Sequence, residues 1–309
     1  MYDVSGVIPG FINDNKTPHD FVKESNFSTS LFKWQPDRDS AISEYQKAAT
    51  DFRNAKAIDK AKDTYIHVAE LQQQMNSTFH AAKSYEQAGL LCKENKDWDE
   101  ACHLMTMAAQ MFQEHGTPDT AALTLDKAGK MMEQVKPGRA IDLYIRACDV
   151  AEIEDRPINC AEFIGKAARL LINSQRYEEA INALQRELEY YLAAESYDKM
   201  KKVIMGQVLV HLTHDDYVAA DLCFKNSLSL PEFGSSEEAG ALEDLLTAYD
   251  EGDDDKGKTT LNLPLFKYLD NAFAKLAKGL VMPTGLGGKA GDNKGIVIED
   301  GEFDGDDLR

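Results

Sequence analysis

Two histidines one helical turn apart have the spacing in this chain that comes nearest to a metal site. His211 and His214 are followed directly by Asp215 and Asp216, so imidazole and carboxylate groups stand together as zinc would require. The pair falls at the end of a predicted helix, and no third cluster of ligands follows it. Capping of the helix and contact of these polar side chains with solvent explain the residues better, so we expect no metal and no cofactor.

A second candidate for metal chemistry is an acidic stretch near residue 300. Asp300-x-Glu302-x-Asp304-Gly305 has the alternating oxygen ligands that open a calcium-binding loop. The bidentate acid that closes such a loop does not follow before Arg309. We therefore expect a solvated acidic segment here.

Catalytic motifs give no support for an enzyme. The patterns G-x-S-x-G and H-E-x-x-H are absent, and the run Gly285-Leu-Gly-Gly288 is a poor phosphate site. We also expect no P-loop nucleotide site, and we predict that the protein is not an enzyme. Five cysteines form no C-x-x-C pair, which favours small core residues in a reducing compartment: Cys92, Cys102, Cys148, Cys160 and Cys223.

The elements that carry these residues follow a regular spacing. Ala41, Ala81, Ala121 and Ala161 are 40 residues apart, and a second alanine series runs half a period out of phase. A small–large–small pattern at i, i+4 and i+7 recurs around these points, as in Ala81-x3-Tyr85-x2-Ala88. Such a pattern lies on one face of a helix, and a fixed period of this length is typical of stacked repeats.

The period predicts an all-α fold. Half a period of about 20 residues accommodates a helix of about 15 to 17 residues and a short turn. We predict a right-handed superhelical solenoid of tetratricopeptide-like antiparallel helix pairs with a C-terminal helical cap. An alanine-rich bundle without superhelical order is the alternative, which the four evenly spaced alanines disfavour. Aromatic and acidic residues at Trp98 and Tyr177, and prolines at 118 and 157, are predicted helix starts.

Composition divides the chain into four predicted parts. They are an atypical N-terminal segment with an apolar loop (1–35), the helical-repeat sheet (36–230), a C-terminal helical bundle (231–282) and a flexible acidic tail (283–309). The last repeat pair is expected at 198–212 and 216–228. Within the bundle we expect helices at 237–249 and 264–280, with an acidic loop at 250–255 between them.

Charge and hydropathy exclude several classes of protein. The formal net charge is −19, which argues against nonspecific binding of nucleic acid and against wholesale adsorption to anionic lipid. The chain has no apolar run of the roughly 18 to 20 residues that a membrane span needs, and no signal-peptide pattern. We expect a cytoplasmic protein.

Two segments outside the repeat suggest binding. Phe27, Leu31, Phe32 and Trp34 are large apolar residues in a polar stretch; they could cap the first repeat or dip into a membrane interface beside Lys33. Residues 302–309 are acidic with Leu308 near their end, which suits either a solubilising tail or capture by a basic partner.

Several long stretches resemble the soluble NSF attachment proteins (SNAPs), most of all the gamma form. They include Leu31-Phe-Lys-Trp-Gln-Pro-Asp-Arg-Asp-Ser-Ala41, Phe79-His-Ala-Ala-Lys-Ser-Tyr-Glu-Gln-Ala-Gly89, Gln207-Val-Leu-Val-His211 and Pro264-Leu-Phe-Lys-Tyr268. The resemblance covers roughly residues 30–280 and the last few residues. Residues 1–26 do not resemble the family's amphipathic first helix.

This resemblance implies an adaptor. SNAPs wrap a SNARE four-helix bundle of the syntaxin type, touch the membrane peripherally through an apolar loop, and recruit the hexameric ATPase NSF, which then disassembles the bundle. By position, the membrane loop would be Phe27, Leu31, Phe32 and Trp34. The NSF-binding end would be Asp304, Asp306, Asp307 and Leu308.

The SNARE-facing residues are less well defined by the resemblance. Lys166 aligns with a basic position of the alpha form, whereas Thr117, Leu123 and Glu162 stand where that form is basic. Since a chain of this charge needs a local basic patch to attract an acidic bundle, the candidates are cations on the first helices of the pairs: Lys83, Lys127, Lys130, Lys166 and Arg169. Each could equally belong to a solvated face. The alternative function is a general helical-repeat peptide-binding scaffold that recruits no ATPase.

Overall fold

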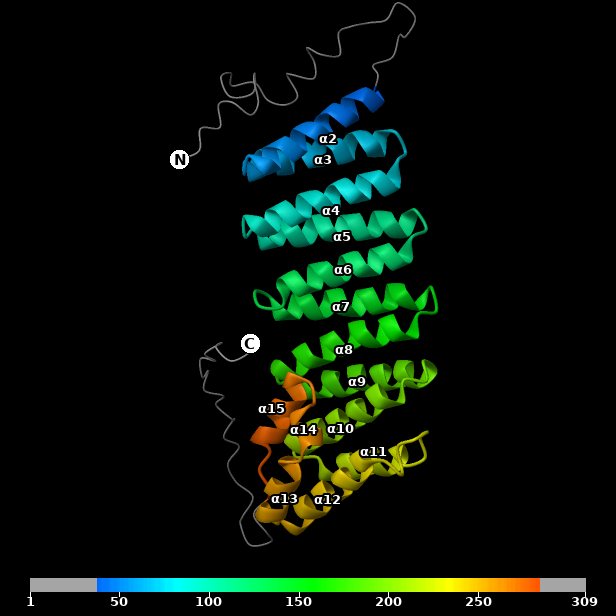
Figure 1. The fold of residues 1–309 in the computed structure, drawn as a ribbon, viewed down its shortest axis with the longest axis vertical. Coiled ribbons are helices and arrows are strands. Elements are labelled where there is room, and N and C mark those ends of the chain that lie inside the picture. Colours follow the sequence, from blue (N-terminus) through cyan, green and yellow to red (C-terminus); the bar gives the residue numbers. More distant parts are fainter. Residues whose placement is uncertain (1–37, 284–309) are drawn as a thin grey trace, which may run out of the picture.

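The computed structural model describes residues 38–283, and within this range it contains fourteen helices and no strand. Figure 1 shows the helices stacked one after another along the long axis, from α2 at one end to α11–α13 at the other. The predicted all-α solenoid is thereby confirmed. The ten helices of the stack are α2 (Arg38–Asn54), α3 (Ile58–Gln74), α4 (Thr78–Glu94), α5 (Trp98–Glu114), α6 (Pro118–Met132), α7 (Pro137–Glu152), α8 (Pro157–Asn173), α9 (Tyr177–Ala193), α10 (Tyr197–Thr213) and α11 (Tyr217–Ser227).

A three-residue turn repeated every 20 residues sets the spacing of the stack. Most helices have 17 residues, and the residue two positions beyond the helix end has a positive φ, as at Lys56, Asn76, Lys96 and Gly116. The next amide donates back to a carbonyl in the last turn of the helix, for example from Ser77 to Gln72 at 2.8 Å. This is the hydrogen bond of a Schellman motif, which satisfies an otherwise free helical carbonyl.

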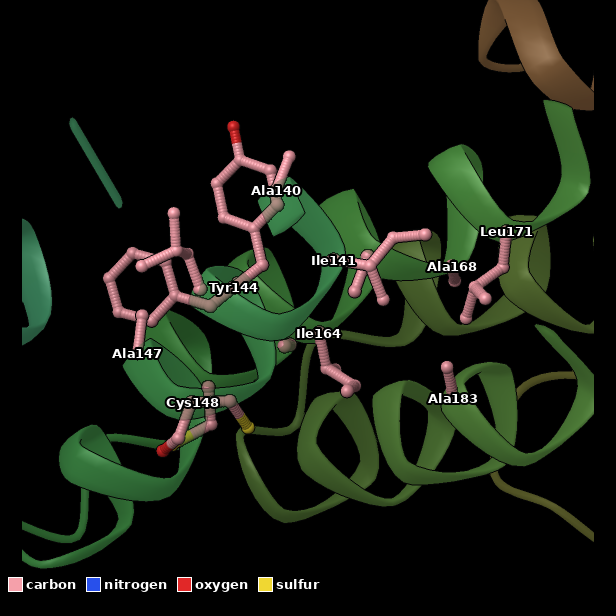
Figure 2. Packing of buried hydrophobic residues seen from close by; sticks show 14 of the residues in the cluster. Ala140, Ile141, Tyr144, Ala147, Cys148, Ile164, Ala168, Leu171 and Ala183 are labelled. Carbon is pink, nitrogen blue, oxygen red and sulfur yellow. The ribbon is translucent and has the colours of Figure 1, made fainter. Parts of the chain in front are cut away.

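The alanine series places neighbouring helices in close contact. Ala81, Ala121 and Ala161, with their half-period counterparts Ala61 and Ala101, are completely buried, whereas Ala41 in the first helix is only half buried. Large side chains fill the spaces between them. Tyr144 lies so close to Gly129 that a Cβ there would come within 2.8 Å of its ring. Figure 2 shows Ile141 of α7 and Ile164 of α8 on the side that faces Ala183 of α9, with the Tyr144 ring pointing away from them.

The C-terminal helices differ from the prediction in two places. The predicted acidic loop at 250–255 is mostly helical, because one helix ends and the next begins within it. Gly252, with a φ of 66°, ends α12. The Asp253 carboxylate then caps the start of α13 by accepting a hydrogen bond from the Lys256 amide at 2.9 Å. The helix predicted for 264–280 is interrupted at Tyr268–Asp270. The observed helices are α12 (Glu237–Glu251), α13 (Asp254–Leu261), α14 (Pro264–Lys267) and α15 (Asn271–Gly279).

Helix α15 turns back onto the stack. It contacts α10 and α8, and Figure 1 shows it, in orange, in front of this part of the solenoid. Phe273 of α15 is completely buried against Gly206 of α10, where a Cβ would come within 2.3 Å of the ring. This close approach requires glycine at position 206.

Candidate functional site

Ion pairs divide the stack into two sides. Alternate helices are linked to each other: Lys127 of α6 pairs with Glu86 of α4 at 2.6 Å, and Lys199 of α10 pairs with Glu162 of α8 at 3.2 Å. The remaining helices are linked in the same way, for example through Lys62 of α3 and Glu100 of α5 at 3.1 Å. We call α2, α4, α6, α8 and α10 the even helices and α3, α5, α7, α9 and α11 the odd helices.

The two sets of helices carry very different charge. The even helices hold twelve basic and nine acidic side chains, a net charge of +3. The odd helices hold six basic and fourteen acidic side chains, a net charge of −8. In a strongly acidic protein, the outward side of the even helices is therefore the part of the stack best suited to an acidic partner.

All five predicted SNARE-facing residues lie on even helices. Lys83 of α4 is exposed and stands over the Phe79 ring, with its ammonium 4.7 Å from the centroid. Lys130 of α6 is exposed and has no ion pair within residues 38–283. Lys127 pairs with Glu86, and Lys166 pairs with Asp126 of the preceding even helix. These two lysines thus neutralise acids of the neighbouring repeat while still reaching the surface.

Arg169 differs from the four lysines because it is enclosed. Its guanidinium pairs with the Glu187 carboxylate of α9, donates to Asp270 at the start of α15 at 2.9 Å, and stacks 4.5 Å from the centre of the Phe273 ring. The Glu187 side chain is only 2% exposed. Gly165 gives the carboxylate room, since a Cβ there would lie 2.7 Å from its Oε1.

The electrostatics of this cluster favour a charged guanidinium. Burial lowers the pKa of Arg169, but the charges and hydrogen bonds of Glu187 and Asp270 outweigh it, so the pKa stands above its ordinary value. The guanidinium is thus paired with two carboxylates of the chain, although the side chain remains 19% exposed. Sequence reasoning missed Glu187 and Asp270, because no local pattern relates Arg169 to a residue 101 positions away.

The two histidines of the candidate metal site, His211 and His214, have different surroundings. His211 is partly buried, and burial lowers its pKa. His214 lies 3.8 Å from Glu178 and packs against the Tyr177 ring. Among the described residues no group of three or more histidine, cysteine or acidic side chains could hold a metal ion.

Four of the five cysteines are buried in the helix stack and the fifth is half buried, as their predicted role in the core requires. Burial raises the pKa of Cys148 and of Cys160 to about 12, and that of Cys92 and of Cys223 to about 11. These thiols are therefore held in their unreactive protonated form.

One motif was overlooked in the sequence. Gly252-Asp-Asp-Asp-Lys-Gly-Lys-Thr259 fits the P-loop spacing G-x-x-x-x-G-K-[ST], and the prediction of no P-loop nucleotide site was made without taking this match into account. A P-loop follows a strand and cradles phosphate with free amides. Here the stretch follows α12 and forms α13, where Lys258 pairs with Asp254 and Gly257 packs against Met282. Three aspartates where phosphate would bind make it unsuited to an anion.

The other predicted site residues lie outside the described range. These are the apolar loop (Phe27, Leu31, Phe32 and Trp34), the acidic end (Asp304, Asp306, Asp307 and Leu308) and the calcium-like stretch from Asp300. Within residues 38–283, no helix is long and apolar enough to cross a membrane.

These features define a class: a helical-repeat protein with a broad charged face. The family model described as soluble NSF attachment protein, SNAP, matches residues 20–262. The gamma-soluble NSF attachment protein of Dictyostelium discoideum is 30% identical over 84% of this chain and 81% of its own length. The chain therefore belongs to the soluble NSF attachment protein family.

One more relative and one solved structure are also similar to this chain. The gamma-soluble NSF attachment protein of Arabidopsis thaliana is 28% identical over 83% of this chain and 87% of its own length. The solved structure of the apo form of RapI covers 76% of this chain and 63% of its own, with 15% identity and a TM-score of 0.43, a likeness too low to bear on function.

Proposed function

We propose that this protein is an adaptor that binds an assembled SNARE four-helix bundle on a membrane, then recruits and stimulates the NSF ATPase for SNARE disassembly in vesicle trafficking. Its family and the names of its relatives, which are NSF attachment proteins, support this role. The protein itself performs no catalysis in this scheme. It works in the cytoplasm, associated peripherally with membranes.

The observation that carries the proposal is the charge difference between the two sides of the stack. A SNARE bundle that presents acidic side chains would meet a net charge of +3 on the even helices and −8 on the odd helices. Lys83, Lys127, Lys130 and Lys166 are the proposed contacts. Arg169 is left out of this contact, because its guanidinium is already paired on both sides.

The two ends of the chain supply the other contacts in this proposal. Phe27, Leu31, Phe32 and Trp34 would enter the membrane interface, where aromatic side chains are favoured. Asp304, Asp306, Asp307 and Leu308 would dock on the basic N-domains of NSF, with Leu308 as the apolar anchor.

The SNARE contact is tested by charge reversal on each side of the stack. We expect Lys83→Glu/Lys130→Glu to weaken capture of a purified SNARE bundle by at least about tenfold, since like charges across an interface cost several kcal/mol. Lys60→Glu/Arg139→Glu makes the same change in net charge on exposed positions of odd helices and should bind as the wild type does. Equal loss in both variants would contradict the proposal.

The NSF contact is tested separately through ATP hydrolysis. With the protein immobilised on a surface, NSF should be stimulated by the wild type and not by Leu308→Ala. An unchanged rate in that variant would remove the assigned role of Leu308. No stimulation by a folded wild type would favour a peptide-binding scaffold that recruits no ATPase.

A further inference from the structure

Helix α15 presents a basic side that no other described residue covers. Asn271, Lys275 and Lys278 are exposed at i, i+4 and i+7, while Ala272 and Phe273 are buried against the stack. We call residues 263–281, which contain α14 and α15, the strap. Lys267, at the end of α14, is exposed as well and adds a third cation.

None of the three strap lysines has an acidic partner among the residues that the structure describes. Lys127 and Lys166 pair with acids of the preceding even helix, but Lys267, Lys275 and Lys278 have no ion pair within residues 38–283. The one acid of the strap, Asp270, pairs with Arg169. Apolar groups stand among these lysines: Tyr268 is 82% exposed and Val281 is 73% exposed. The strap is thus suited to an acidic peptide with isolated apolar residues.

A segment of that composition belongs to the same chain. Residues 299–307 contain six acids, and Phe303 and Leu308 are the large apolar residues among and beside them. The C-terminal segment follows the strap directly in sequence, and Met282, just after the strap, is buried against Gly257 of α13.

The connecting segment is long enough for the two to meet. Fifteen residues lie between Pro283 and Glu299, and the random-coil relation gives a chain of this length an average span of about 19 to 23 Å. Helix α15, with nine residues, is about 14 Å long. Tethering in one chain gives the acidic segment an effective concentration on the order of millimolar at the strap. Even weak ion pairs at the surface are then enough for the strap and the acidic segment to be in contact part of the time.

We propose that the strap binds the chain's own acidic segment, residues 299–308, through Lys267, Lys275 and Lys278. This self-contact rests on the proposed function for its consequence, since the same segment is proposed to dock on NSF. The free adaptor then holds its NSF-binding end against the strap, and NSF must compete for it. An acidic helical bundle bound to the strap is the competing occupant.

Zero-length cross-linking of the full-length wild type tests the contact without NSF. A carbodiimide joins a carboxylate to a lysine amine only where the two groups touch. We expect intramolecular links in the monomer between the strap lysines and acids of residues 299–307, identified by mass spectrometry. The links should decrease when salt rises from about 0.1 M to about 1 M, which shortens the Debye length from about 10 Å to about 3 Å.

Charge reversal with a matched control links the contact to regulation. Lys275→Glu/Lys278→Glu should abolish the links through Lys267 as well and increase cleavage of residues 299–308 by a protease. It should also lower the concentration at which the adaptor half-saturates NSF stimulation. Lys60→Glu/Lys93→Glu changes the net charge equally on exposed positions outside the strap and should behave as the wild type.

The outcomes separate this proposal from the proposed function. Absent links, links only between two copies, or links unchanged in the strap variant would overturn the self-contact, even where NSF is stimulated normally. Loss of SNARE-bundle capture in the strap variant, without any tail links in the wild type, would assign the strap to the bundle. If the links form but the protein does not stimulate NSF, the contact between the strap and the acidic segment would stand, and its proposed role in regulating NSF binding would be wrong.

Discussion

Arg169 and Lys166 lie three residues apart on α8, yet their surroundings make them different kinds of residue. Lys166 reaches the surface, and its side chain is 42% exposed beside Asp126. Arg169 is paired with an almost fully buried carboxylate. An exposed ion pair contributes at most about 1 kcal/mol to stability, whereas removing one partner of a buried pair leaves an uncompensated charge.

We predict that Arg169→Ala lowers the free energy of unfolding by about 3 to 5 kcal/mol, because the Glu187 carboxylate would stay buried without its partner. Lys166→Ala, the control on the same helix, should change it by less than about 1 kcal/mol. Urea denaturation followed by circular dichroism measures both values. Similar losses in the two variants would mean that the Glu187 carboxylate reaches water when Arg169 is removed.

At the scale of elements, the docking of α15 depends on one glycine. Gly206 lies inside α10, where glycine ordinarily costs about 0.5 to 1 kcal/mol relative to alanine. Phe273 occupies the space that a side chain there would need. The penalty of a helical glycine is therefore offset by the contact between the stack and α15.

We predict that Gly206→Ala detaches α15, since its Cβ would come within 2.3 Å of the Phe273 ring. Hydrogen exchange of residues 271–279 should become faster, while α3–α7 keep their protection. Gly240→Ala in α12 is the matched control, because a Cβ there meets nothing within 4 Å. That variant should be neutral or slightly more stable, and unchanged exchange of α15 in Gly206→Ala would show that α10 and α15 can move apart cheaply.

At the scale of the whole molecule, the repeat helices contact mainly their neighbours in sequence, as in a one-dimensional solenoid. Burial is uneven along this stack. Helix α2 has three buried residues, whereas α8, of equal length, has nine. Stability is then expected to vary along the stack instead of being shared by one cooperative core.

We predict that amide protection in the native protein is lowest in α2 and highest around α8–α10, where α15 adds contacts. Hydrogen exchange resolved by mass spectrometry along the full chain measures this gradient. Phe112→Ala, which empties a completely buried site in α5, should accelerate exchange mainly in α4–α7. Uniform acceleration over the whole chain would instead indicate a single cooperative unit.

The sequence by itself determined the repeat. The alanine spacing predicted the helices, and helix starts at Trp98, Pro118, Pro157 and Tyr177 agree with the structure. These features are local, because a 3.6-residue period, a proline at a first turn and a small residue at a helix contact are all encoded within one helix. The conformation of the turns was harder to predict from the sequence, because non-glycine residues such as Lys56 and Asn76 adopt the positive φ.

Only the tertiary structure decided what the charged residues face. It assigned Arg169 to Glu187 and Asp270, paired Lys127 and Lys166 with acids about one repeat earlier, and turned α15 back over α8 and α10. The repeat pairs leave a weak sequence signal, opposite charges about 40 residues apart. The contact of Arg169 with Asp270 leaves none, because it depends on how a non-repeating segment folds back across the stack, which only the three-dimensional packing of α15 fixes.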